Sequence, residues 1–423
     1  MAPALNPLAA ACDVKGWLTP QPEQIQEILQ REVKPKPLRI CSGGTTSRCA
    51  EDQHWSLDLS GKCRAWHWDS ELFRLRFGTG WTMGALQDQL ARQGRMVPTG
   101  LSGLPGAGFL LTGGMGPLSR SLGLAIDHLQ SIQGIWGNGS CFSLQRPSSQ
   151  QPLDPEPLLQ WRGLLGAGLF LGVICEIEIA TLPLQPIRVL QGLLSPHQLS
   201  ALSQRAETFP LGLTLQWCWA DRLEVMLVAN GADRDALQGI KTLERDLALS
   251  EATVSDVAGL HQLPRFGALS FTHQPLIPAH QEVVGLLSNT WGPATAEIYD
   301  VLHHAMATRP HERCSIASQQ LGGVVGDLPS DSSSFVHRQA EWKPWITASW
   351  PEGDSFAREK ALAWLEVTWN QLERHCQGIH LAQLHDHLPW HQRELTGAFG
   401  AWLPQLRRLK QQLDPGGALP RLC

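Results

Sequence analysis

The chain of 423 residues is long enough for two domains, and its composition is that of a folded globular protein. Hydrophobic residues make up 43% and charged residues 17% of the sequence, which does not fit an intrinsically disordered protein. The formal net charge is −5, and no run of Lys or Arg forms a basic stripe. Because a nucleic-acid partner requires a basic surface, the charge argues against one.

The cysteines and the first residues bear on the cellular compartment. Ten cysteines occur at irregular spacing, with no CxxC pair and no zinc-finger set. We interpret them as reduced thiols of a cytosolic protein, and a covalent or metal-binding use of one or two stays open. Residues 1–12 lack the basic and long apolar segments of an export signal, and no stretch reaches the ~18 apolar residues of a membrane span. We therefore expect a cytoplasmic protein with no membrane partner.

Helices and strands are expected to alternate over the first part of the chain. Apolar residues at helical spacing predict a surface helix over 15–33. A short strand over 38–41 leads into a glycine loop at 42–46. A helix is expected to begin after Thr82, which suits an N-cap, and to stop at Gly94. Strand-like runs lie between these elements, at 55–59, 63–68 and 72–77.

Glycine is densest over residues 98–123, and the pattern changes after that block. The runs 129–136 and 140–144 predict a hairpin that turns at Gly137. A polar loop is expected over 147–157, followed by small, apolar and β-rich sequence over 158–183.

Glycine becomes rarer after Pro186, where helices alternate with strands such as 213–219 and 223–228. We therefore place a domain boundary near residue 185. The last element predicted is a basic amphipathic helix over 403–413, which ends at Asp414-Pro415.

Two glycine-rich loops have the composition of phosphate-binding turns. Glycine permits a positive φ, so successive backbone N–H groups can point toward one anion. The first loop is 42–46, and the second is 100–108 with its continuation at 113–116. Neither is a GxGxxG that opens a helix, and neither contains the Lys of a GxxxxGK[ST] loop. Taken alone, each loop could equally serve only for turns and tight packing.

The order of these motifs resembles the FAD-binding domain of the vanillyl-alcohol-oxidase or PCMH-type flavoproteins, in particular the berberine-bridge-enzyme-like branch. The resemblance covers roughly residues 15–185, is weak over 186–330, and returns in part at 331–338 and 403–418. The segments that carry it are 39–46, Leu57-Asp58-Leu59-Ser60, 78–86, 98–127, 162–174 and 406–415.

The resemblance implies an α+β fold with two domains and a returning C-terminal segment. The family fold would place a two-subdomain PCMH-type FAD-binding domain at 1–185. An α+β substrate domain, with an antiparallel sheet covered by helices, would occupy 186–394. Residues 395–423 would return to the FAD domain.

By the same resemblance, the glycine loops would hold the FAD diphosphate, and Asp127, Val173 and Ile174 would line the adenosine or isoalloxazine side. For Asp127, a turn residue that caps the next strand is the alternative. The residues so assigned to the cofactor are Ser42, Gly43, Gly44, Thr45, Thr46, Gly100, Leu101, Gly103, Leu104, Gly106, Gly108, Gly113, Gly114, Gly116, Asp127, Gly172, Val173 and Ile174.

The chain departs from the family at the positions that attach the flavin. Family members with two covalent links use a His and a Cys, which fall here on Thr45 and Leu101. Neither side chain can carry the flavin, so we expect FAD to be bound without a covalent link. The family residue that controls the access of oxygen falls on Leu104, whose bulk favours a dehydrogenase over an oxidase.

The substrate side of the family supplies a Tyr base in a Gly-x-Tyr-x-Asn strand. Here the segment 378–383 takes that place, with His380 at the Tyr position and Gln383 near the Asn. A His of ordinary pKa, about 6.5, suits a general base at neutral pH. The alternative is that His380 is one of several histidines on a polar surface. Arg338 matches a family His-Arg strand and would pair either with an anionic substrate or with a carboxylate of the sheet.

A metal site is not expected, because His385, His387 and His391 have only Asp386 as a further ligand at suitable spacing. The expected function is an FAD-dependent oxidoreductase that takes hydride from a small CH–OH or similar donor and passes electrons to oxygen or another acceptor. Two alternatives stay open: a catalytically degenerate FAD-binding protein, and a cofactor-free sugar- or lipid-binding protein. The second would use tryptophans of the later half, namely Trp217, Trp219, Trp291, Trp342 and Trp345.

Overall fold

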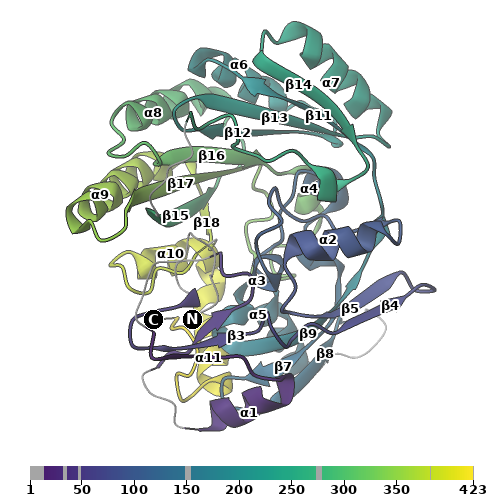
Figure 1. Cartoon of the computed structure of the whole chain (residues 1–423), viewed down its shortest axis with the longest axis vertical. Coiled ribbons are helices and arrows are strands. Elements are labelled where there is room, and N and C mark those ends of the chain that lie inside the picture. The colour runs from purple at the N-terminus through teal and green to yellow at the C-terminus, as the bar shows by residue number, and fades with distance from the viewer. Residues whose placement is uncertain are drawn as a thin grey trace.

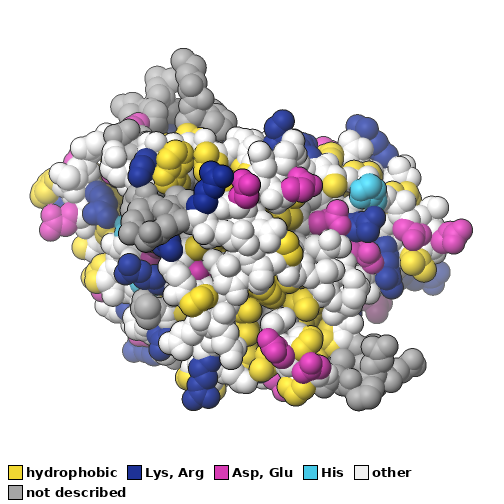
Figure 2. All heavy atoms as spheres, turned by 90° about the horizontal axis from the view of Figure 1, so that it is seen from below, with side chains coloured by type: hydrophobic (Ala, Val, Ile, Leu, Met, Phe, Trp, Pro, Cys, Tyr) yellow, Lys and Arg dark blue, Asp and Glu magenta, His cyan; other side chains and the backbone are white. Residues whose placement is uncertain are grey.

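The computed structural model describes residues 14–31, 36–45, 49–147, 154–272, 279–381 and 383–422, and it confirms a mixed α+β fold with a large antiparallel sheet. Figure 1 shows two halves, with the large sheet and its helices in the upper half. On the face drawn in Figure 2, Lys and Arg side chains are scattered among acidic and uncharged ones. No helix within the described ranges has the length and apolar character needed to cross a membrane.

The lower half contains two main sheets. A parallel sheet has the strand order β1 (Gly16–Leu18), β3 (Trp55–Asp58), β2 (Arg39–Cys41). An antiparallel sheet has the order β4 (Trp66–Asp69), β5 (Arg74–Gly78), β9 (Gly172–Ala180), β7 (Leu129–Trp136), β8 (Cys141–Gln145). A short ladder joins β6 (Arg95–Met96) to β10 (Leu182–Pro183). The helices of this half are α1 (Pro22–Gln30), α2 (Met83–Ala91), α3 (Ala107–Leu111), α4 (Ser119–Leu122) and α5 (Pro155–Leu171).

The upper half is built on one eight-stranded antiparallel sheet. Its strand order is β14 (Ser250–Val257), β11 (Ile187–Leu193), β13 (Leu223–Asn230), β12 (Leu213–Trp219), β16 (Ser315–Gln320), β17 (Trp342–Pro351), β15 (Ala279–Leu287), β18 (Gly378–His380). Four helices cover one face, namely α6 (Pro196–Ala206), α7 (Arg234–Asp246), α8 (Thr295–Ala307) and α9 (Ser355–Leu372). The opposite face is turned toward the lower half, where Thr214 Oγ1 donates a hydrogen bond to Pro117 O over 2.8 Å.

Two early elements differ from the expectation. Trp17 lies in strand β1 instead of a helix over 15–33, because β1 pairs in parallel with β3 and the helix begins only at Pro22. Residues 158–164 and 168–171 are helical parts of α5, which is broken by non-helical backbone at 165–167, although the small and apolar composition of this segment suggested strands. Packing against the C-terminal helix decides this, since Gly163 lies against leucine side chains of that helix.

The C-terminal elements leave the large sheet and rejoin the lower half, as the yellow ribbons of Figure 1 show. Helix α10 (His391–Phe399) packs on β18, and helix α11 (Leu403–Leu413) packs on α5. The expected domain boundary near residue 185 falls between β10 and β11, and the one at residue 394 falls inside α10.

A buried ion pair fixes the end of α11. Lys410 is paired with Asp414, and its Nζ also donates to Phe170 O over 2.7 Å. The carboxylate of Asp414 in turn accepts hydrogen bonds from the N–H groups of Ala418 and Leu419. Because the Asp414 side chain is fully buried, the pair holds the C-terminal segment against α5 through contacts that water does not reach.

We predict that Asp414→Ala destabilises the protein by about 3–5 kcal/mol, because the buried ammonium of Lys410 then loses this carboxylate. Urea unfolding followed by circular dichroism measures this loss. The control is Glu27→Gln, which removes a solvent-exposed pair with Arg31 and should cost only about 0.5 kcal/mol or less. Equal losses in the two variants would contradict a structural role for the Asp414 carboxylate.

Candidate functional site

A cavity of about 380 Å³ lies where the two glycine loops meet the large sheet. Its walls come from both halves of the molecule. The first loop contributes 42–45, the second contributes 105–108, and the sheet side contributes Gln281, Val283 and Gln383. This volume is in the range of small-molecule and cofactor sites.

The two glycine loops touch through their backbones. A Cβ on Gly43 would lie 2.2 Å from Gly106 N, and a Cβ on Gly106 would lie 2.2 Å from Ser42 Oγ. Ser42 Oγ joins the loops further, because it accepts from Ala107 N over 3.2 Å and donates to Thr79 O over 2.5 Å. Glycine is therefore required at both positions for close packing, and the same packing forms the wall of the cavity.

The residues expected to hold the cofactor divide into two groups. The cavity is lined by Ser42, Gly43, Gly44, Thr45, Gly106, Gly108, Gly172 and Ile174. Another group takes no part in the lining, namely Gly100, Leu101, Gly103, Leu104, Gly113, Gly114, Gly116, Asp127 and Val173. Thr46 lies outside the described residues.

Local packing explains why the residues of the second group do not line the cavity. Gly103 packs against Gly84, and Gly116 packs against Thr99 O. Val173 is turned to the opposite side of β9 from Ile174, into a cluster of buried apolar residues. Leu104 is 62% exposed and does not line the cavity, so its side chain does not shield the cavity from oxygen.

Leu101 contacts the large sheet instead of the cavity. It packs against an apolar cluster that includes Val189 and Met226, two residues of neighbouring strands. The second glycine block therefore serves both the cavity and the contact between the two halves.

Asp127 and Arg338 form an ion pair between the halves. Arg338 Nη1 lies 2.8 and 2.9 Å from the two carboxylate oxygens of Asp127, and its Nη2 donates to Ser333 Oγ over 2.7 Å. Asp127 also accepts from Leu124 N over 3.1 Å, which closes the turn before β7. The structure thus gives Arg338 a carboxylate partner in the protein, and it gives Asp127 the turn-capping role that was its alternative.

His380 is buried, so the interpretation of this residue as part of a polar surface is wrong. It is 3% exposed and lies at the end of β18, with its Nε2 3.2 Å from Thr112 O. Burial and the nearby Lys343 charge hold the pKa of His380 well below its usual value of 6.5. The imidazole is therefore neutral. Because a carbonyl accepts from Nε2, the free electron pair is on Nδ1, which has no partner among the described residues.

Gln383 lies at the cavity wall, close to the edge of the large sheet. Its Oε1 accepts from Val283 N over 2.9 Å, which fixes the side chain beside β15. Thr112, the hydrogen-bond partner of His380, lines the same cavity from the other half. His380 and Gln383 are thus both held close to the glycine loops, although they are far from them in sequence.

A buried charge network next to the cavity had no clear signal in the sequence. His385 lies between Glu282 and Glu394, at 3.2 and 2.7 Å. Burial acts to lower the pKa of His385, but the two carboxylates outweigh it and raise that pKa to about 10. Glu282 and Glu394 are distant in the chain, so only the fold could reveal the cluster. Within the described ranges, no group of three or more His, Cys, Asp or Glu side chains is arranged to hold a metal ion.

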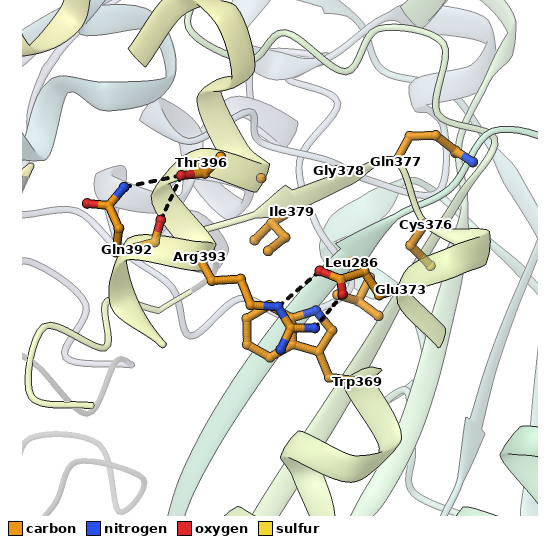
Figure 3. Close-up of a pocket in the computed structure, with 11 residues that line it drawn as sticks. Leu286, Trp369, Glu373, Cys376, Gln377, Gly378, Ile379, Gln392, Arg393 and Thr396 are labelled. Atoms are coloured by element: carbon orange, nitrogen blue, oxygen red, sulfur yellow. Dashed lines mark hydrogen bonds and ion pairs between the residues drawn. The ribbon is translucent and has the colours of Figure 1, made fainter. Parts of the chain in front are cut away.

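A second hollow, of about 450 Å³, lies between α9, β18 and α10 (Figure 3). Arg393 stacks over the Trp369 ring at 3.8 Å and pairs with Glu373 at 2.8 Å. Because the polar side chains of this hollow bind one another, it is a weaker candidate for a ligand-binding site than the glycine-loop cavity.

Gly108 provides a test of the cavity. A Cβ at this position would meet nothing within 4 Å, so a larger side chain can extend into the open space. We predict that Gly108→Leu folds normally but binds flavin at least about tenfold more weakly, because the leucine side chain occupies the cavity. Flavin absorbance after gel filtration measures the loss. Gly108→Ala is the matched control and should keep most of the flavin, whereas full flavin retention by Gly108→Leu would place the cofactor elsewhere.

The comparisons with known proteins agree with this geometry. The FAD binding domain family matches residues 19–145. An FAD-linked oxidoreductase of Dictyostelium discoideum is 25% identical over 280 residues, which is 63% of this chain and 57% of that protein. The uncharacterized FAD-linked oxidoreductase YgaK of Bacillus subtilis is 20% identical over 359 residues, or 79% of this chain and 73% of that protein.

Solved structures match nearly the whole chain. A chitooligosaccharide oxidase superposes with a TM-score of 0.81 at 15% identity, covering 99% of this chain and 93% of its own. Berberine bridge enzyme from Eschscholzia californica gives a TM-score of 0.75 at 18% identity, covering 96% and 88%.

Residues 19–145 thus match an FAD binding domain, and the chain as a whole has the fold of PCMH-type FAD-binding flavoproteins. Within that class, the chain has the fold of the berberine-bridge-enzyme-like branch. The family resemblance found in the sequence is therefore confirmed.

Proposed function

We propose that the protein is an FAD-dependent oxidoreductase that removes hydride from a CH–OH or similar donor. The observation that carries the proposal is the cavity itself, because it joins the glycine loops of one half to Gln383 and the surroundings of His380 in the other. Such a cavity places a cofactor-binding wall close to a candidate base, because Thr112 lines the cavity and hydrogen-bonds His380. FAD-linked oxidoreductases among the relatives support the same reaction class.

The residues at the cavity fit an FAD. The N–H of Gly43 donates no hydrogen bond to another described residue, so it is available to a phosphate oxygen. Leu111, Ile174 and Leu384 give the cavity apolar walls that suit an aromatic ring system. Gly43, Gly44, Thr45, Gly106 and Gly108 would hold the cofactor. Bound FAD would supply the acceptor for the hydride.

In this proposal, His380 is the base. The carbonyl of Thr112 orients the imidazole through Nε2, which leaves Nδ1 free to take the hydroxyl proton of the substrate. Because the pKa of His380 is low, the neutral base is present throughout the physiological pH range. The buried position of the residue keeps water from competing for the proton.

A dehydrogenase remains the preferred form of the enzyme. Its support is the family match of the sequence alone, because Leu104 is exposed and does not line the cavity. The alternative of a cofactor-free sugar- or lipid-binding protein is less well supported, because most of the tryptophans that it would use are buried in the core. These are Trp217, Trp219, Trp291 and Trp342.

We propose that FAD is held without a covalent bond, since Thr45 lines the cavity and Leu101 does not. The purified protein should be yellow, and acid precipitation should release all of the flavin into the supernatant, where its absorbance is measured. Cys49 also lines the cavity. Flavin that stays in the pellet of the native protein, but not in that of Cys49→Ser, would overturn the proposal.

Substitution of the base tests the chemistry. In an anaerobic screen of alcohols, sugars and hydroxy acids, His380→Ala should bleach the flavin about 10²–10⁴ times more slowly than the native protein while retaining it. With the substrate at saturation, the native rate should stay constant above about pH 6.5 and fall only in acid, because protonation of a base of lowered pKa removes its electron pair. Stopped-flow absorbance measures both effects.

The control for this experiment is His337→Ala. His337 also hydrogen-bonds a carbonyl, that of Gly397 at 2.6 Å, but Gly397 does not line the cavity, whereas Thr112, the partner of His380, does. An unchanged rate in His380→Ala would remove the residue from the mechanism. A flavin that no substrate in the screen bleaches would instead favour a catalytically degenerate FAD-binding protein.

A further inference from the structure

A row of three polar side chains crosses the inner face of the large sheet. Gln216 of β12 lies directly opposite Gln319 of β16, which lies directly opposite Lys343 of β17. Side chains that face each other across neighbouring strands share one side of a sheet. This is the side that carries Thr214, which bonds to the lower half. The three side chains are 0%, 2% and 7% exposed.

Lys343 is a buried cation that has no counter-ion among the described residues. No carboxylate of the described residues forms an ion pair with it, and its one close partner is the Trp345 ring at 5.3 Å. Burial alone lowers the pKa of Lys343, to about 8. Other buried cations of the chain, such as Arg338 and Lys410, have carboxylate partners. An uncompensated ammonium in this position destabilises the fold, so its presence calls for a ligand.

The two glutamines in the row are also incompletely bonded. Gln216 Nε2 donates to Thr214 Oγ1 over 2.9 Å, but its Oε1 has no partner among the described residues. Gln319 Nε2 likewise lacks an acceptor. A buried polar atom that is left without a partner destabilises the fold. Amide groups without hydrogen-bond partners, next to an ammonium without a counter-ion, are features of a site that binds a polar ligand.

His380 belongs to the same face. It lies opposite Gly285, and Gly285 lies opposite Trp345, the ring that Lys343 contacts. Gly285 has no side chain to separate the imidazole from the lysine, and the charge of Lys343 acts on His380. The face therefore offers a cation and an amide donor at one end and a free Nδ1 electron pair at the other.

We propose that Lys343 and Gln319 form a carboxylate-binding subsite, so that the substrate is a hydroxy acid whose alcohol group is presented to His380. This assignment rests on the proposed function and names its substrate class. A carboxylate supplies the counter-ion that Lys343 lacks and accepts from the free N–H of Gln319. A neutral alcohol or sugar would leave the ammonium uncompensated.

Binding measurements test the subsite independently of turnover. The probes are lactate, glycerate, gluconate and galacturonate, each compared with its neutral amide by titration calorimetry on the purified full-length protein. At least one carboxylate should bind about tenfold or more tightly than its amide, a difference of about 1.4 kcal/mol. Lys343→Met should abolish the preference, and Lys343→Arg should retain part of it.

Two further readouts separate a ligand site from a structural role. Lys343→Met should melt at a higher temperature than the native protein, because a buried uncompensated charge is replaced by an apolar side chain. Lys360→Met is the matched control, since Lys360 lies over the Phe356 ring at 4.2 Å but is exposed. It should change neither the melting temperature nor the carboxylate preference.

Several outcomes would overturn the subsite. These are equal binding of acids and amides, no millimolar binding of any acid, a preference that survives in Lys343→Met, or a lower melting temperature of that variant. The flavin content of the same samples is measured separately by absorbance. A colourless protein that binds acids more tightly than amides would refute the proposed function and support the carboxylate subsite. A yellow protein that binds acids and amides equally would refute the subsite and leave the proposed function standing.

Discussion

The close approach of two backbones, at Gly43 and Gly106, is the constraint on which the site depends. Neither position has room for a Cβ, because each would lie 2.2 Å from an atom of the other loop. Ser42 strengthens the contact by bonding to both Ala107 N and Thr79 O. The loops come from distant parts of the chain, so their contact fixes how β2 and α3 are placed. A cavity with a backbone wall follows directly from this contact.

The two halves are held together by polar contacts between rigid elements. The Asp127–Arg338 pair and the Arg120–Glu341 pair each join the lower half to the upper half. His380 and Thr214 add hydrogen bonds to carbonyl groups across the same boundary. Breaking one member of a buried pair leaves a charge without compensation, so these contacts specify a single arrangement of the halves. The cavity lies at this boundary, and its shape depends on that arrangement.

The sequence predicts those parts of the fold that local chemistry determines. Thr82 caps its helix as expected, since its side chain accepts from Ala85 N, and the hairpin around Gly137 forms between β7 and β8. The first glycine loop was located from its composition alone. The helical parts of α5 were missed because their small and apolar residues resemble a β-rich segment, and the packing of α5 against α11 is not visible in the local sequence.

Register between distant strands explains why other parts of the site could not be predicted. Asp127 matched a family turn, yet its partner Arg338 is 211 residues away. The row from Gln216 to Lys343 exists only because β12, β16 and β17 align in one register, and no local pattern in the sequence marks it. His380 was found through a family position, but its burial and its low pKa come from the sheet and from Lys343.

Compensation of charge is the feature that distinguishes the inner face of the sheet from the rest of the buried interior. His385 is enclosed by two carboxylates, and Lys410 has both a carboxylate and backbone carbonyls around it. The charges of His385 and Lys410 are therefore compensated within the protein and need no ligand. Within the part of the chain that the structure describes, Lys343 contacts only an aromatic ring, and the neighbouring amides have atoms without partners. The other deeply buried Lys and Arg side chains of the described residues have carboxylate partners, so an ammonium that lacks one supports the proposal that an anion binds there.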